Sequence, residues 1–87
     1  MDGVFDIYHS LPKTVRAVQF TEKYKDRIYS QISGNCSVDF EDGDPILKVT
    51  TVHGETAIVR LSDWIVEDTM PGTYYPIKDE VFKNNYV

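Results

Sequence analysis

The spacing of apolar residues changes along the chain, and each spacing predicts a different element. Residues 14–20 are β-branched and roughly alternate with polar residues, which is typical of a strand. Thr21 can then cap a helix by accepting a backbone N–H, and Gly34 can end that helix in a left-handed conformation. The apolar positions of this helix recur every four residues on one face: Tyr24, Ile28 and Ile32.

Beyond this helix the pattern returns to a period of two, which predicts antiparallel strands. A short strand at 37–40 is followed by the turn signal Asp42-Gly43. Pro45 cannot donate a hydrogen bond to a strand ladder, so the next strand is expected to begin near Ile46.

Two β-rich runs, 46–52 and 55–61, are separated only by His53-Gly54, which predicts a tight two-residue hairpin. In that register apolar side chains oppose one another on both faces: Val49 with Ile58, and Ile46 with Leu61. One helix covers only one face of a sheet. We therefore expect the second face to be covered by the C-terminal aromatics, by closure into a partial barrel, or by another copy in a homodimer or higher homo-oligomer.

The last quarter of the chain predicts four further segments. These are a strand at 64–67, a turn at 71–72, an extended segment at 74–78 and a short helix at 79–86. Pro76 restricts the extended segment to a sheet edge or a bend. Asp79 can cap the helix, in which Phe82 and Tyr86 point the same way.

Together these elements predict a small α+β domain: a mainly antiparallel, curved sheet of about five strands, one helix after the first strand, and a short C-terminal helix. The 87 residues make one domain, in which residues 1–12 form a loose N-terminal arm or a strand laid on the body.

The single cysteine, Cys36, excludes an intrachain disulfide and fits a reducing compartment. No apolar run reaches the roughly 20 residues of a membrane span, so we expect a cytoplasmic protein.

The net charge of −5 comes from residues 35–87, because acidic and basic residues nearly balance before them. The chain lacks the basic patch that direct nucleic-acid binding needs. Its acidic run is Asp39, Glu41, Asp42 and Asp44. As an EF-hand loop this run fails, because Asp44 stands where glycine is required and Thr50 where a glutamate should coordinate. We read it as a solvated turn and expect no metal and no other cofactor.

Catalysis has few candidates in this chain. His9 and His53 are the only imidazoles, and the sequence holds no serine-hydrolase, zinc-protease or phosphate-loop motif. We interpret His53 as a hairpin residue, His9 as part of the N-terminal segment and Cys36 as a small buried hydrophobe. A small enzyme is therefore the third of the functions that we consider.

Aromatic residues are dense near the C-terminus: Trp64, Tyr74, Tyr75, Phe82 and Tyr86. Adjacent tyrosines in an extended segment point to opposite faces, so at most one can join a given core layer. The other ring is expected to contact a protein partner, or to stack on a nucleotide-like ligand whose phosphate Arg60, Lys78 or Arg16 contacts. The candidate binding residues are Trp64, Tyr74, Tyr75, Arg60 and Lys78; packing of these rings in the core alone is the alternative.

Several motifs resemble a group of small uncharacterised proteins from tailed phages and prophages. They are V-x-A-x-Q-[FW] at 15–20, T-x-x-G at 51–54, G-D-W-I at 62–65, and G-x-[FY]-Y-P-x-K-x-x-x-F-x-x-x-Y at 72–86. Ser62 stands where the group usually has glycine. No activity is assigned to the group. The resemblance implies a non-enzymatic phage accessory protein that binds, and so inhibits or redirects, a host factor in host takeover or counter-defence. A protein that sequesters a nucleotide signal between protomers is the alternative.

Overall fold

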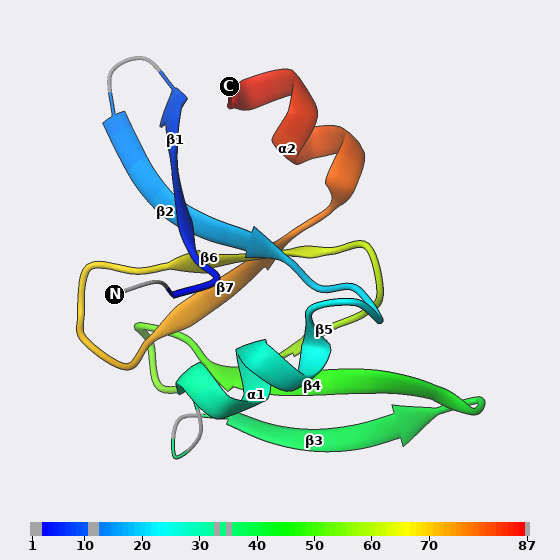
Figure 1. The fold of residues 1–87 in the computed structure, drawn as a ribbon. Coiled ribbons are helices and arrows are strands. Elements are labelled where there is room, and N and C mark those ends of the chain that lie inside the picture. The colour runs from blue at the N-terminus through cyan, green and yellow to red at the C-terminus, as the bar shows by residue number, and fades with distance from the viewer. Residues whose placement is uncertain (1–2, 11–12, 33, 35, 87) are drawn as a thin grey trace.

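The computed structural model describes residues 3–10, 13–32, 34 and 36–86 (Figure 1). In chain order the elements of these residues are β1 (Asp6–Ser10), β2 (Lys13–Gln19), α1 (Lys25–Ile32), β3 (Cys36–Glu41), β4 (Asp44–Thr50), β5 (Thr56–Val59), β6 (Trp64–Glu67), β7 (Tyr74–Ile77) and α2 (Asp79–Asn85). The strands form one sheet of order β1-β2-β6-β7 and another of order β3-β4-β5, and all pairs are antiparallel. The α+β class is confirmed, but the described part of the chain has seven strands in two sheets rather than about five in one.

The N-terminal segment is part of the larger sheet over the residues that the structure describes. β1 pairs with β2 from Asp6 opposite Ala17 to Ser10 opposite Lys13. Phe5, just before β1, is buried in the core and stacks on Tyr74. Within the segment 1–12, the expectation of a strand laid on the body therefore holds for Asp6–Ser10, while residues 1–2 and 11–12 lie outside the described residues.

The first helix forms as its local signals predict. The Tyr24 N–H donates to Thr21 Oγ1 at 3.3 Å, so Thr21 closes the turn that precedes α1 rather than capping its first residue, and Gly34 has a φ of 93°. Ile28 and Ile32 are buried, and Tyr24 packs against the same cluster. No helix among the described residues combines the length and the apolar character that a membrane span requires.

The turn between β4 and β5 is longer than the expected two residues, and it occupies residues 51–55. The Thr51 N–H donates to the Glu55 carbonyl at 2.8 Å, and the Gly54 N–H donates to the Thr51 carbonyl at 2.9 Å. A two-residue hairpin turn of type I′ would need a positive φ at both His53 and Gly54. Gly54 has one, at 83°, but the described non-glycine residues with a positive φ are Asp42 and Ser62 only, so His53 does not.

This longer turn shifts the register of β4 against β5 by one residue from the expected pairing. Leu47 lies opposite Val59, and Val49 lies opposite Ala57, so these four apolar side chains share one face. The opposite face carries Lys48 paired with Ile58, which is 36% exposed. The expected pairing of Val49 with Ile58 was therefore wrong, although the opposite face still carries Ile46, which is 5% exposed; the homo-oligomer stays an untested prediction.

Two clusters of buried side chains lie on opposite faces of the larger sheet. The main cluster joins both sheets to α1 and includes Phe20, Ile28, Leu47, Val49, Ile65 and Tyr74. The second, which we call the α2 cluster, is centred on Ala17, Val66 and Phe82, with Tyr8, Val15, Trp64, Tyr75, Ile77 and Tyr86 packed around them. α2 thus covers a sheet face that α1 leaves open (Figure 1).

Candidate functional site

The two adjacent tyrosines point to opposite faces as expected, but both pack inside the protein. Tyr74 is buried in the main core, where its ring centroid lies 5.8 Å from that of Phe5. Tyr75 is half-buried in the α2 cluster, and burial together with the neighbouring Tyr86 raises the pKa of its hydroxyl to about 12. Tyr74 therefore offers no ring surface to a partner, and Tyr75 offers part of one.

Trp64 attaches α2 to the sheet. Its ring stacks on Phe82 with centroids 4.0 Å apart and an interplanar angle of 4°. Its indole N–H donates to Asp79 Oδ1 at 2.8 Å. One face of the Trp64 ring and its indole N–H group are thus already engaged in contacts within the protein.

Asp79 is a second anchor of α2 rather than its cap. The N-cap residue is Lys78, which makes no side-chain cap bond, so the expected cap by Asp79 is wrong. The carboxylate instead accepts hydrogen bonds from Trp64 and from Gln19 Nε2 at 3.1 Å, and pairs with Lys83 at 3.1 Å. The hydrogen bonds from Trp64 and Lys83 lower the pKa of Asp79.

We predict that the stabilisation by Asp79 depends on pH. Because its folded pKa lies below its unfolded value of about 3.9, the contribution is complete above that value and is lost as the pH falls through the folded pKa. Melting temperatures of the wild type and Asp79→Asn should therefore differ at pH 7 and converge toward pH 2. A difference that stayed constant over this range would show that the Asp79 charge is not linked to folding.

The two predicted cations lie on either side of Asp63. Arg60 forms a forked ion pair with Glu41, with Nε to Oε1 at 2.7 Å and Nη2 to Oε2 at 3.0 Å. Lys78 is exposed, with Nζ 4.0 Å from Asp63 Oδ1. The five predicted residues therefore do not form one binding surface: Tyr74 is in the main core, Trp64 and Tyr75 are in the α2 cluster, and Arg60 is already paired.

The nucleophile and base candidates are separate in the fold. His9 Nδ1 lies 3.1 Å from Thr14 Oγ1, and His53 is exposed in the β4–β5 turn. Burial raises the pKa of the Cys36 thiol, which is opposite to the shift that activates a cysteine. Over the described ranges, no group of three or more His, Cys, Asp or Glu side chains is placed to hold a metal ion.

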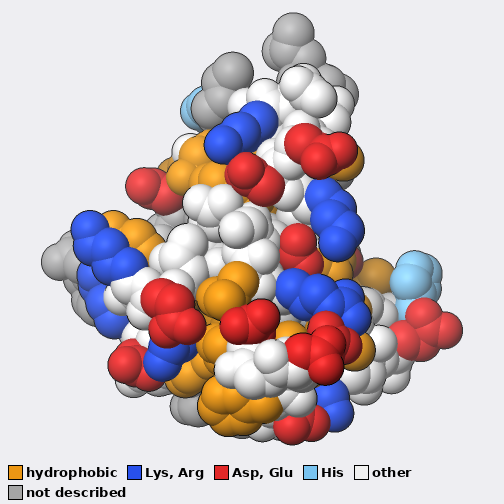
Figure 2. All heavy atoms as spheres, turned by 90° about the vertical axis from the view of Figure 1, so that its right-hand side faces the viewer, with side chains coloured by type: hydrophobic (Ala, Val, Ile, Leu, Met, Phe, Trp, Pro, Cys, Tyr) orange, Lys and Arg blue, Asp and Glu red, His pale blue; other side chains and the backbone are white. Residues whose placement is uncertain are grey.

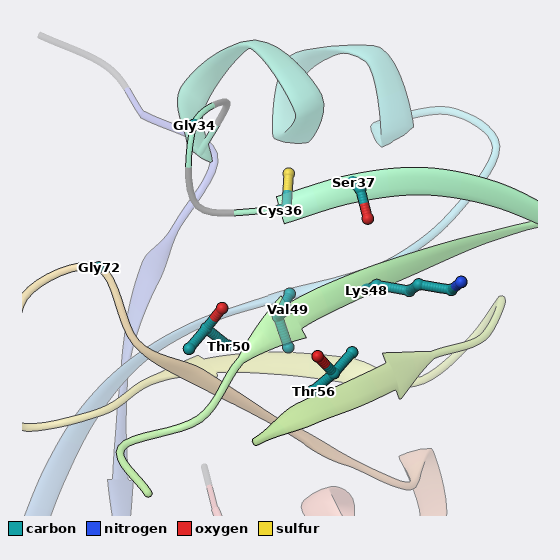
Figure 3. Close-up of a pocket in the computed structure, with 8 residues that line it drawn as sticks. All are labelled: Gly34, Cys36, Ser37, Lys48, Val49, Thr50, Thr56 and Gly72. Atoms are coloured by element: carbon teal, nitrogen blue, oxygen red, sulfur yellow. The ribbon is translucent and has the colours of Figure 1, made fainter. Parts of the chain in front are cut away.

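A cavity of about 380 Å³ lies beside one end of the smaller sheet, lined by residues of β3, β4 and β5 and by Gly72 (Figure 3). Its one cation is Lys48, which is already paired with Asp39 at 3.1 Å. Figure 3 shows the Cys36 sulfur pointing toward α1, away from the Ser37 and Lys48 side chains. None of the residues that line it is aromatic, so the cavity offers no ring on which a nucleobase could stack.

A second hollow, of about 330 Å³, brings Arg16 and Tyr75 together, as the nucleotide hypothesis requires. Glu67 and Asp68 line the same hollow, and Arg16 Nη1 is 3.5 Å from Glu67 Oε1. Two carboxylates and one cation make this an unfavourable place for a phosphate.

The most exposed large apolar side chain of the described residues is one that the sequence did not single out. Phe40 is 67% exposed, and Val38, two residues before it on the same side of β3, is 46% exposed. They lie opposite Leu47 and Pro45 of β4, in a hairpin whose turn end projects past α1 (Figure 1). We call Val38 and Phe40 the hairpin patch.

Acidic side chains border the hairpin patch along the chain, and those of Asp39, Glu41 and Asp44 belong to the opposite face of the hairpin. Asp39 and Glu41 alternate with it along β3, and Asp42 and Asp44 follow at the turn. Figure 2, which looks onto this end of the molecule, shows apolar side chains at its lower edge with acidic ones beside them. The sequence signal was present: apolar residues alternate with carboxylates at 38–41, a pattern that we interpreted only as a solvated turn.

Known proteins offer no guide to this site, because no family model, curated protein or solved structure matches the chain. The resemblance to phage proteins stays a prediction. The function is therefore argued from the surface of the described residues.

Proposed function

We propose that this protein is a non-enzymatic phage accessory protein that works in the host cytoplasm by binding a host protein and blocking or redirecting it. The docking surface that we propose is the hairpin patch with its acidic border. The observation that carries this proposal is the exposure of Phe40, because a large aromatic ring in water is costly unless a partner covers it.

Aromatic side chains are the commonest anchors of protein interfaces. The Phe40 ring makes no ring stack with another described aromatic side chain, unlike Phe5, Phe20 and Phe82. Removing it should thus cost the fold little. A residue that is dispensable for folding but exposed and apolar is what a docking surface supplies.

A binding role also fits the chemistry of the rest of the molecule better than the two alternatives. An enzyme needs a nucleophile or base with an orienting partner, and His9, His53 and Cys36 lie apart. A nucleotide-binding protein needs an unpaired cation beside an aromatic ring, and Arg16 is paired with Glu67 beside Tyr75.

We expect Phe40→Asp to lose binding to a host protein. The wild type and the variant, each immobilised, are incubated with bacterial extract, and captured proteins are identified by mass spectrometry. The candidate is then produced separately and titrated against both. We expect affinity to fall by at least about 30-fold for Phe40→Asp, corresponding to about 2 kcal/mol for an interface anchor.

Val81→Asp is the matched control, because Val81 is exposed on α2, away from the hairpin, and 46% accessible like Val38. Both variants should melt within a few degrees of the wild type, since exposed positions change stability by about 0.5 kcal/mol or less. Equal loss of binding in both variants, or full binding by Phe40→Asp, would contradict the proposed surface.

A further inference from the structure

We infer that the partner binds β3 as an added strand: an extended protein segment in which apolar and basic residues alternate. This rests on the proposed function and specifies how the hairpin patch is used. Three parts of the structure support it: the free edge of β3, the side chains that this strand presents and the charge around them.

The first part is the hydrogen-bonding edge. β3 pairs only with β4 among the described strands, so its other edge is open. Asp42 and Gly43 have φ values of 52° and 85°, which defines a two-residue turn of type I′. The pair that flanks such a turn, Glu41 with Asp44, is hydrogen-bonded, and bonded pairs then alternate with non-bonded ones along the ladder.

It follows that Cys36, Val38 and Phe40 occupy non-bonded positions, where N–H and C=O point away from β4 toward the open edge. Pro45, opposite Phe40, fits this assignment because a proline there removes no bond between β3 and β4. This also explains why β4 begins at Asp44 rather than near Ile46 as expected.

The second part is the match of side chains. Residues paired across two strands share a face. Partner residues opposite Val38 and Phe40 would therefore cover the hairpin patch, and the residue between them would lie on the other face, opposite Asp39. The segment that fits reads apolar, basic, apolar, with its basic residue opposite Asp39; Glu41, the next carboxylate on that face, is already paired with Arg60.

The third part is the charge. The Phe40 N–H, which faces the open edge, donates to Asp39 Oδ1 at 2.8 Å, and this bond lowers the pKa of Asp39. An incoming strand must replace that bond. A partner carbonyl can accept the Phe40 N–H while a lysine or arginine on the same strand takes over Asp39 Oδ1, so a basic segment is favoured over a neutral one.

The same charges disfavour a second copy of this chain as the occupant. Asp42 and Asp44 have no ion pair among the residues described, and the chain carries a net charge of −5. β3 itself carries no basic residue, so a second copy paired along this edge would bring further carboxylates and no cation to Asp39. The positive charge of a basic partner would instead be complemented by the acidic residues of the hairpin.

The probe that tests this inference is a fluorescein-labelled seven-residue peptide of alternating valine and lysine, titrated with the full chain by fluorescence anisotropy. We expect saturable binding that weakens with added salt, and no binding of the matching valine–glutamate peptide. Val38→Pro is the sharpest variant, because it removes an outward N–H without breaking the β3–β4 ladder. We expect Val38→Pro and Phe40→Ala each to weaken binding by about tenfold or more, and the control Val81→Ala by less than about twofold.

Equal binding of the lysine and glutamate peptides, or unchanged binding to Val38→Pro, would overturn the inference. So would a native mass showing that the free protein is a dimer that Val38→Pro converts to a monomer. The outcome is separable from the proposed function: if Phe40→Asp loses the host partner while Val38→Pro keeps it, the hairpin patch is the docking surface but strand addition is not the mode.

Discussion

Replacing Phe82 by alanine is expected to lower the free energy of unfolding by about 3–5 kcal/mol, the range for a buried phenylalanine. Phe82 is the one buried side chain of α2. Its ring lies between those of Trp64 and Tyr86, at centroid distances of 4.0 and 4.7 Å, and meets the edge of Tyr8 at 5.0 Å. Alanine would remove every ring contact that holds the helix on the sheet.

Urea unfolding followed by tryptophan emission measures this loss directly, because the only tryptophan, Trp64, stacks on Phe82. A small domain has a total stability of about 5–15 kcal/mol, so the variant should be close to unfolding at room temperature. Val81→Ala, at the preceding exposed position, should change stability by about 0.5 kcal/mol or less. A loss below about 1 kcal/mol for Phe82→Ala would mean that α2 does not pack as described.

The parts of the fold that the sequence predicted well are those set by local chemistry. α1 follows a turn that Thr21 closes, has apolar residues at four-residue spacing and precedes Gly34, all within 14 residues. β6 spans residues 64–67 as predicted, because the run is short and apolar on both faces. In such cases neighbours in sequence decide the structure, so reading the sequence is enough.

The register of β4 against β5 could not be predicted because it depends on which residues accept a positive φ. His53 does not, so the turn lengthens to include Thr51, and a shift of one residue moves Ile58 to the face opposite Val49. Ser62 shows the reverse case, since it adopts a φ of 81° where the resembling phage proteins usually have glycine. Whether a non-glycine residue adopts a positive φ depends on the surrounding packing and not on the residue type alone.

The packing of the candidate binding residues could not be predicted for a similar, non-local reason. The aromatic density near the C-terminus predicted a surface, but α2 folds back and makes Trp64 and Tyr75 part of a second core. Phe40 follows the alternation of a core-facing strand, and it is exposed only because the hairpin extends beyond the helix that covers the sheet. Neither the length of that overhang nor the path of α2 can be read from residue spacing.

The register itself can be tested by placing one charge on each face of the smaller sheet. Val49 is 1% exposed and Ile58 is 36% exposed, whereas the two-residue turn would have put both side chains on the same face. We expect Val49→Asp to cost more than about 4 kcal/mol, because it buries a carboxylate without a partner, and to leave the protein largely unfolded.

Ile58→Asp should cost only about 1 kcal/mol, because the new carboxylate can reach solvent and its cross-strand neighbour is Lys48. Circular dichroism during thermal melting compares the two variants with the wild type. Equal losses of stability in the two variants would contradict the observed register and favour the expected pairing of Val49 with Ile58. A larger loss for Val49→Asp than for Ile58→Asp would confirm the register and leave the hairpin patch as the surface at which we propose that a partner binds.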